Sequence, residues 1–142
     1  MSESGQKSFV LFPLGKKRFA LPAEKVTELA RPDNIQTFPH RTRLVTGVLV
    51  RRGHIVPVYD VAQTLIEGDA PSRKFYLIAN RQFENRIEWT AIPVTGECEL
   101  ASGEPQRSDR KMPDHVLGEL AIGNEIVEVL NLEKLIAREE AV

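Results

Sequence analysis

The sequence repeats itself at an offset of 71 residues, and this repeat limits the folds that the chain can adopt. In one block the offset aligns Ala20, Pro22, Glu28, Leu29 and Ala30 with Ala91, Pro93, Glu99, Leu100 and Ala101. In another it aligns Val45, Gly47, Leu49, Ile55, Val56 and Val58 with Val116, Gly118, Leu120, Ile126, Val127 and Val129. The alternative is a low-complexity coincidence, but the matches include prolines and glycines, which fix backbone geometry. We therefore predict two related small units, each too small to be stable alone and packed together.

Both units consist of short apolar runs separated by turns. Such runs occur at 9–12 and 19–21, at 44–50 and 55–59, at both ends of 75–94, in "VLGELAI" and in "EIVEVL". Gly123 and Asn124 predict a tight turn between the last two runs. Leu132, Leu135 and Ile136 follow at helical spacing and predict a short amphipathic C-terminal helix. The polar stretch 101–114 has the composition of a mobile loop. Many short strands with one helix indicate an all-β protein.

Composition excludes several classes of protein. The chain has 142 residues, with 19 Lys+Arg against 20 Asp+Glu, a balance that argues against binding nucleic acid through its phosphates. Cys98 is the only cysteine, which favours a reducing compartment. Residues 1–7 are polar and predict a disordered leader rather than a signal peptide. The apolar runs are too short to span a bilayer, so we predict a cytoplasmic protein without direct membrane insertion.

The residues that carry chemistry do not form a reactive or metal-binding pattern. His40, His54 and His115 lie far apart, without neighbouring ligands, and are interpreted as surface or loop histidines. Cys98 lies between two glutamates that disfavour a thiolate, and is interpreted as a small strand residue. Asp60 has no acid or base partner and is predicted to cap the segment after it, as Asn131 caps the C-terminal helix. We predict no enzyme, no metal and no cofactor.

Three segments together resemble the CheW-like domain of bacterial chemotaxis. They are "FVLFPLGKKRFALPAEKVTEL", "LVTGVLVRRGHIVPVYDV" and "VLGELAIGNEIVEVLNLEKLI", and the resemblance covers about residues 8–137. The most specific part is the pattern Gly-x-x-x-x-Arg-Gly-x-x-x-Pro-Val-x-Asp from Gly47 to Asp60. The resemblance implies one domain of two packed five-stranded, Src-homology-3-like barrels with a short C-terminal helix. We place barrel one at about 8–70 and barrel two at about 74–137.

The resemblance also implies a function in signal transduction. Members of this family are non-catalytic adaptors that couple methyl-accepting chemoreceptors to a CheA-type histidine kinase. The expected partners are the cytoplasmic hairpin of a chemoreceptor and the regulatory domain of the kinase, with recruitment to membrane receptor arrays. We do not assign residues to the kinase contact, for which the edges of the barrels are the expected place.

A receptor-binding site is expected around the turn between 44–50 and 55–59. We hypothesise that Arg52 binds carboxylate or backbone groups of the receptor, because the planar guanidinium binds two acceptors and is weakly hydrated. Gly53 would supply the positive φ of a tight hairpin. A solvated turn that protects a sheet edge is the alternative.

Four further site assignments follow from the resemblance. Val26 and Glu28 match a segment that the family uses at its receptor-facing groove. Val50 and Arg51 stand where the family usually has Asn and Leu, and this difference bears on which receptor is bound.

Two other functions stay open. A divergent scaffold of a surface-motility system would bind only one of the two partners. A small-barrel nucleic-acid-binding protein would use a basic patch made of Lys16, Lys17, Arg18, Arg51 and Arg52.

Overall fold

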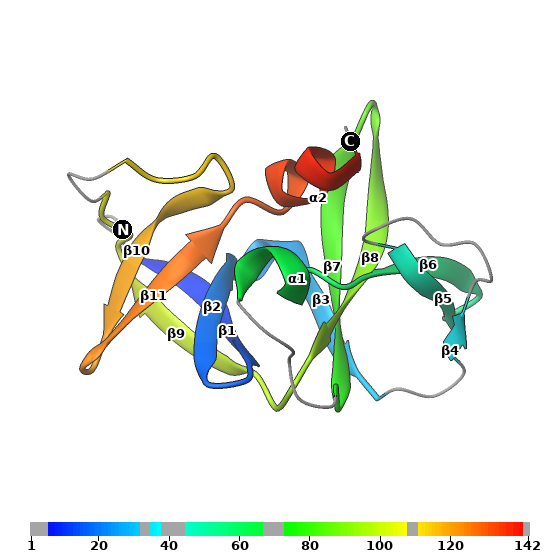
Figure 1. Ribbon diagram of the computed structural model, residues 1–142, viewed down its shortest axis with the longest axis horizontal. Helices are drawn as coiled ribbons and strands as arrows, with labels where there is room; N and C mark the ends of the chain where they lie inside the picture. The colour runs from blue at the N-terminus through cyan, green and yellow to red at the C-terminus, as the bar shows by residue number, and fades with distance from the viewer. Residues whose placement is uncertain (1–5, 32–34, 38–44, 67–72, 108–110, 141–142) are drawn as a thin grey trace.

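The computed structural model describes residues 6–31, 35–37, 45–66, 73–107 and 111–140. Its strands form a five-stranded and a six-stranded sheet, which lie side by side as two units, called barrel A and barrel B below (Figure 1). This β-rich architecture confirms the predicted fold class. In the described part of the chain, no helix is both long and apolar enough to cross a membrane.

Barrel A is the five-stranded sheet with the strand order β10-β11-β2-β1-β9. Its strands are β1 (Lys7–Leu14), β2 (Lys17–Pro22), β9 (Glu99–Gly103), β10 (Val116–Ile122) and β11 (Glu125–Leu130). Gln106, shortly after β9, exchanges backbone hydrogen bonds of 2.9 and 2.8 Å with Glu119 of β10. These bonds join the segment that follows β9 to β10, at the other end of the strand order, so the sheet closes on itself.

Barrel B is the six-stranded sheet with the strand order β3-β7-β8-β6-β5-β4. Its strands are β3 (Val26–Ala30), β4 (Ile35–Thr37), β5 (Val45–Arg51), β6 (His54–Tyr59), β7 (Phe75–Phe83) and β8 (Arg86–Val94). The three-residue strand β4 is one more than the five expected. An ion pair of 2.6 Å between Glu28 of β3 and Arg51 of β5 joins strands that lie far apart in the order. In barrel B, side chains rather than backbone hydrogen bonds thus connect β3 to the far side of the sheet.

The predicted division of the chain into two successive barrels at about residue 70 is wrong. Barrel A combines β1 and β2 with β9 to β11, and barrel B combines β3 to β6 with β7 and β8. Each half of the chain thus supplies its first hairpin to the barrel of the other half. The exchanged hairpins join through parallel contacts, Val129 with Ala20 in barrel A and Val58 with Ala91 in barrel B.

The repeat itself is preserved in the structure. An offset of 71 residues carries β5 onto β10 and β6 onto β11 with identical bounds. Both hairpins have a β-bulge at the matching place, between Val45 and Gly47 in one and between Val116 and Gly118 in the other. The strand orders also correspond, once β4 is set aside. The sequence repeat therefore reports two copies of one topology.

The main core lies between the barrels and is covered by α2 (Leu132–Glu140). Leu132, Leu135 and Ile136 are buried in it, which confirms the predicted amphipathic helix. Asn131 caps this helix as predicted, because its Oδ1 accepts a hydrogen bond of 3.0 Å from the Lys134 N–H. Smaller apolar clusters fill the interior of each barrel.

Short helical turns connect the strands elsewhere. The 3-10 turn η1 (Ala23–Lys25) links β2 to β3, and α1 (Ala62–Leu65) follows β6. Asp60 stands before α1, where it accepts a hydrogen bond of 3.3 Å from the Ala62 N–H and pairs with Arg73 at 2.7 Å. Asp60 thus contacts the start of the segment after it, although the N-cap position of α1 is Val61 and has no side-chain cap bond.

Two predicted boundaries are corrected at the ends of segments. Residues 1–5 of the predicted leader lie outside the described residues, but Lys7 already belongs to β1. The predicted loop 101–114 begins inside β9, because this strand pairs with β1 as far as Gly103.

Candidate functional site

The turn between β5 and β6 has an unusual backbone. Arg51 and His54 are the last paired residues, and between them Arg52 has a φ of +52° and Gly53 a φ of +79°. A turn with two positive φ angles matches the right-handed twist of the strands that it joins. Glycine is favoured in such turns because it adopts a positive φ without steric cost. For a residue with a side chain, the left-handed backbone conformation costs roughly 1–2 kcal/mol. Gly53 therefore has the role predicted for it, whereas Arg52 occupies its position against its conformational preference.

Barrel A shows that the fold does not require an arginine at this position. The offset of 71 residues carries Arg52 onto Gly123, whose φ is +59°. The other hairpins show the same contrast, with Gly15 at φ +69° between β1 and β2 and Glu84 at φ +56° between β7 and β8. Barrel A thus uses glycine at both turns and barrel B uses charged residues. Non-glycine residues with positive φ concentrate at functional sites.

The two charged turns lie at the same end of barrel B. Strands β6 and β8 are parallel neighbours, so the turns that precede them lie at the same end of the sheet. Between these strands is a depression of about 280 Å³, lined by His54, Ile55, Pro57, Ile87, Glu88 and Trp89. The ring of His54 lies 4.8 Å from the ring of Trp89. This end therefore combines exposed charge with apolar and aromatic surface.

Three charged side chains form a network at this end. Glu28 accepts two hydrogen bonds from Arg51, at 2.9 Å from Nε and 2.6 Å from Nη2, and a longer one of 3.4 Å from Nε of Arg52. The side chain of Glu28 is 16% exposed and that of Arg52 is 67% exposed. Hydrogen bonds from Arg51, and to a lesser degree from Arg52, hold the pKa of the Glu28 carboxyl below its ordinary value against the opposing effect of burial.

The Glu28–Arg51 pair lies over the end of the barrel B interior. Side chains alternate along a strand, so Arg51 faces the same side as the buried Leu49. Glu28 stands opposite the buried Ile78 on the neighbouring strand β7. The two charged side chains thus lie on the inward faces of β5 and β3. They mark the end of the apolar interior, where the barrel meets solvent.

Five of the six predicted receptor-binding residues come together here. Val50, Arg51, Arg52 and Gly53 form the turn, and Glu28 reaches it from β3. Val26 does not, because it is half-buried against the core between the barrels. The register of β3 shifts between Val26 and Glu28, so these two side chains do not share a face as simple alternation would suggest.

Exposed isoleucines belong to the same surface and were missed in the sequence analysis. Ile55, which pairs with Val50 across the hairpin, is 72% exposed, and Ile87 is 65% exposed. A signal for Ile55 was present in the sequence, because alternation with the inward-facing Val56 and Val58 places it outside the barrel. No comparable signal marked Ile87.

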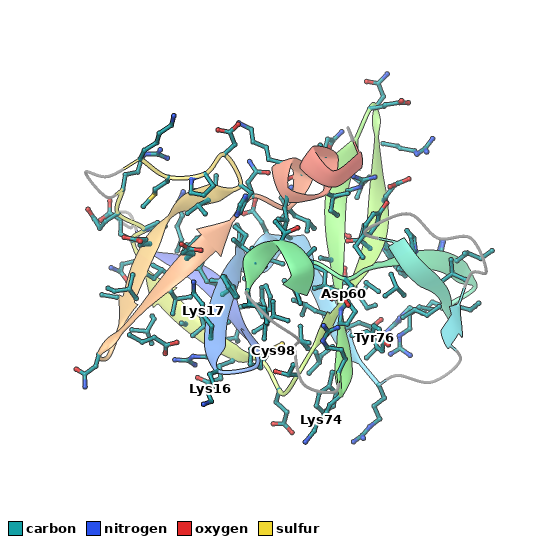
Figure 2. All side chains as sticks on the ribbon, in the orientation of Figure 1. Lys16, Lys17, Asp60, Lys74, Tyr76 and Cys98 are labelled. Carbon is teal, nitrogen blue, oxygen red and sulfur yellow. The ribbon has the colours of Figure 1, made fainter. Side chains whose placement is uncertain are left out.

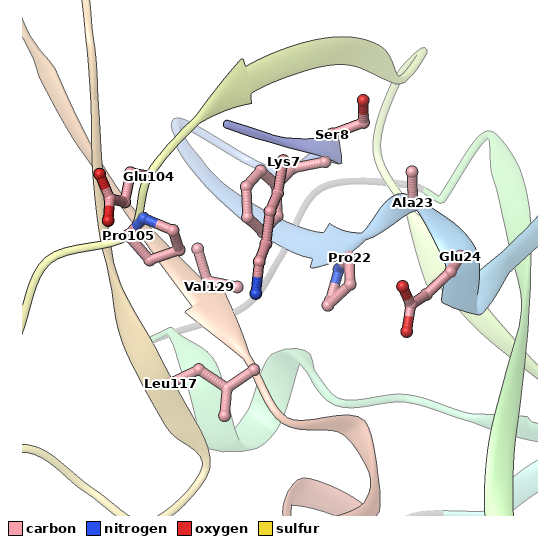
Figure 3. A pocket seen from close by; sticks show the side chains of 10 residues that line it. Lys7, Ser8, Pro22, Ala23, Glu24, Glu104, Pro105, Leu117 and Val129 are labelled. Atoms are coloured by element: carbon pink, nitrogen blue, oxygen red, sulfur yellow. The ribbon is translucent and has the colours of Figure 1, made fainter. Parts of the chain in front are cut away.

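A second depression of about 890 Å³ lies on barrel A (Figure 3). Lys7, Glu24 and Glu104 supply its charges, and Leu117 and Val129 supply apolar surface. The remaining residues that line it are Ser8, Phe9, Pro22, Ala23 and Pro105. Its mixed charged and apolar lining thus suits contact with another molecule.

The single cysteine is not activated. Cys98 lies in the centre of the view in Figure 2, half-buried against the core between the barrels. Burial raises the pKa of its thiol to about 11, so the thiol is protonated at neutral pH. It lies just before β9, not within a strand as predicted.

The described histidines, His54 and His115, lie in different surroundings. His54 is exposed on β6, whereas His115 is buried in the turn before β10, so of the interpretation as a surface or loop histidine only the loop part holds for His115. His40 lies outside the described residues. Across the described ranges, no three His, Cys, Asp or Glu side chains are grouped to bind a metal ion.

The basic residues of the nucleic-acid hypothesis do not form one patch. Lys16 and Lys17 belong to the β1–β2 hairpin of barrel A (Figure 2), whereas the two arginines are at the β5–β6 turn of barrel B. Arg18 is engaged by Glu125 at 2.6 Å and by Glu99 at 3.3 Å. The charges are divided between barrels and partly neutralised, which disfavours tracking a phosphate backbone.

The fold and this site can now be compared with known proteins. The family model of the CheW-like domain matches residues 8–140, nearly the whole chain. The chain belongs to the CheW-like family. This match confirms the resemblance noted in the sequence. The CheW-like family consists of chemotaxis scaffold and adaptor proteins.

Curated relatives and a solved structure agree with this membership. The chain is 27% identical to the protein FrzA of Myxococcus xanthus, over 96% of this chain and 91% of that protein. It is 22% identical to the chemotaxis protein CheW of Klebsiella aerogenes, over 97% of this chain and 86% of that protein. The crystal structure of the scaffolding protein TtCheW from Thermoanaerobacter tengcongensis matches with a TM-score of 0.70 at 18% identity, over 91% of both chains. The last match supports the two-barrel fold.

Proposed function

We propose that this protein is a non-catalytic coupling adaptor that binds the cytoplasmic hairpin of a chemoreceptor and the regulatory domain of a CheA-type histidine kinase. In this role it works in the cytoplasm and is recruited to membrane receptor arrays through the receptors. Membership of the CheW-like family supports the class of function. The observation that carries the receptor site is Arg52, which has a positive φ where the equivalent turn of barrel A has a glycine.

The surface around Arg52 has the composition of a small binding site. Arg52 is exposed at the tip of the hairpin, and Val50 and Ile55 are exposed beside it. Interfaces concentrate binding energy in arginine and large apolar anchors that lose water together. A guanidinium beside aliphatic side chains suits a protein segment that carries both acceptor and apolar groups.

The test compares the wild-type protein with Arg52→Gly in binding to a purified receptor cytoplasmic fragment and, separately, to the kinase. Glycine retains the backbone geometry of the turn and removes only the side chain. We expect receptor affinity to fall at least about tenfold, as for interface arginines, with kinase affinity unchanged. Thermal stability should be equal or slightly higher, because the strain at positive φ is relieved. Unchanged receptor affinity would refute the receptor site at this turn.

A second candidate is a divergent scaffold that binds only one of these partners. The observations that favour it are Val50 and Arg51, which replace the usual Asn and Leu, and the 27% identity to FrzA. Capture from cell lysate separates the two candidates. Recovery of both a kinase and a chemoreceptor supports the coupling adaptor, whereas recovery of the kinase alone supports the divergent scaffold.

A further inference from the structure

The two arginines of the turn differ in how closely they bind Glu28. Arg51 engages both carboxylate oxygens, with its Nη2 at 2.6 Å from Oε1 and its Nε at 2.9 Å from Oε2. Arg52 reaches only Oε2, at 3.4 Å from its Nε. A bidentate arginine–carboxylate pair is the strongest geometry available to these groups, and 3.4 Å is beyond the usual range of a charge-assisted hydrogen bond. Arg51 therefore dominates the carboxylate.

Barrel A shows that this arrangement is not part of the shared topology. The offset that carries Glu28 onto Glu99 carries Arg51 onto Ile122, an apolar residue packed against the interior of barrel A. Glu99 instead pairs with Arg18 of β2, at 3.3 Å. The topology is thus compatible with an apolar side chain at the position of Arg51, and the guanidinium there is specific to the turn of barrel B.

We propose that Arg51 is a positioning residue that holds Glu28 within the barrel, so that the terminal nitrogens of Arg52 remain for a carboxylate of the bound partner. This inference rests on the proposed function, since it concerns the same turn. It also gives the chemistry of the partner segment: an acidic side chain next to an apolar one. The apolar side chain would lie on Val50 and Ile55, which are exposed beside the turn.

The physical reason is competition for one carboxylate. Without Arg51, Glu28 still has the contact with Arg52, whose Nε is already 3.4 Å away. A small rotation would convert this contact into a bidentate pair, and binding a partner would then require breaking it. The local charge would change as well, because loss of Arg51 removes one positive charge from the turn. Both effects weaken attraction for an acidic partner.

The test measures affinity for the receptor cytoplasmic fragment in four variants: Arg51→Leu, Glu28→Gln, the double variant, and Arg52→Gly. Leucine removes the guanidinium and keeps an aliphatic side chain of the kind that barrel A has at this position. We expect Arg51→Leu to weaken binding about tenfold and the double variant to restore it to within about threefold of wild type. Glu28→Gln alone should bind several-fold more tightly, because it releases both arginines.

Arg18→Leu is the matched control, because it also removes an arginine from a glutamate pair, but in barrel A. It should leave receptor affinity unchanged. Thermal melts of all variants identify any that fail to fold. They also keep the double variant decisive, because a merely structural role of Arg51 would show as a fall in melting temperature in Arg51→Leu that the double variant reverses, whereas a positioning role changes affinity with the melting temperature unchanged.

The outcomes separate this inference from the proposed function. If Arg52→Gly leaves receptor affinity unchanged, the proposed receptor site itself is wrong. If Arg52→Gly abolishes binding while Arg51→Leu has no effect, only the positioning role is overturned. A loss in Arg51→Leu that Glu28→Gln does not rescue would mean that Arg51 contacts the partner directly, which also overturns it.

Discussion

Barrels A and B share one topology but differ at their turns, and this difference separates the needs of the fold from those of function. Strand order, the bulge in one hairpin and the parallel contact between halves all correspond. At the turns, barrel A has Gly15 and Gly123 where barrel B has Glu84 and Arg52, all with positive φ. A residue that departs from its own duplicate at a conformational cost is better explained by a task outside the fold.

A second difference lies in the exchanged hairpins. The strands β7 and β8 have nine residues each, whereas β1 and β2 have eight and six. The longer hairpin extends beside α2 (Figure 1), where the Gln82 N–H donates to Glu133 at 2.8 Å. Glu133 also pairs with Lys25 of η1 at 2.7 Å. The extension of the β7–β8 hairpin thus connects barrel B to the C-terminal helix. The shorter β1–β2 hairpin of barrel A does not need such a connection.

The largest expected effect tests whether the barrels are one cooperative unit. Leu49 and Leu120 are equivalent under the offset, and each is 2% exposed inside its own barrel. Truncation to alanine should cost about 2–5 kcal/mol in each case, by loss of burial and formation of a cavity. Because the barrels exchange hairpins and share the main core, both variants should show a single unfolding transition in calorimetry. Two separate transitions would contradict this.

Transplanting the arginine to the other barrel gives the next effect in size. An added Cβ at Gly123 meets no atom within 4 Å, so Gly123→Arg should cost only the conformational term of roughly 1–2 kcal/mol. Denaturant unfolding measures this cost. Receptor affinity should stay at the wild-type value, because barrel A lacks the Glu28–Arg51 network. A gain in receptor binding would show that the turn alone suffices.

The smallest effect concerns acid stability and should appear in both barrels. Arg51 lowers the pKa of Glu28, and Arg18 lowers that of Glu125, each mainly through hydrogen bonds. A carboxyl whose pKa is lowered by folding stabilises the protein above its unfolded pKa, and this contribution disappears as the pH falls through the folded value. Wild type should therefore lose its advantage over Glu28→Gln, and likewise over Glu125→Gln, as the pH falls below about 4.5. Melting temperatures of wild type and both variants from pH 7 to 3 measure this loss of stability. A difference in melting temperature that stays constant over this pH range would contradict the two pKa shifts.

The sequence predicted strands well where alternation was strong. "VLGELAI" and "EIVEVL" coincide with β10 and β11, and α2 with its Asn131 cap was also predicted. The exchange of hairpins was not, because alternation shows which face of a strand is buried and not which strand it pairs with. The contacts that decide it join residues far apart in the sequence, and Ala20 and Val129 are more than a hundred positions apart.

The candidate site was predicted in part for similar reasons. The hairpin pattern placed Arg52 and Gly53 at the turn, since a turn is a local feature. The pairing of Glu28 with Arg51 depends on closure of barrel B, which no local pattern shows. Val26 lies apart from the turn because one bulge in β3 changes the face of every residue beyond it, and a bulge is not visible in the alternation of a sequence.

The hairpin exchange has a consequence for stoichiometry. Two separate, identical half-chains that exchanged hairpins in this way would form a twofold-symmetric dimer with the same turn on both sides. Joining the halves in one chain removes that constraint, so one turn can carry arginines while its duplicate keeps glycine. Under the proposed function, each molecule would then bind one receptor segment at the β5–β6 turn and would not cross-link two copies of the same partner there.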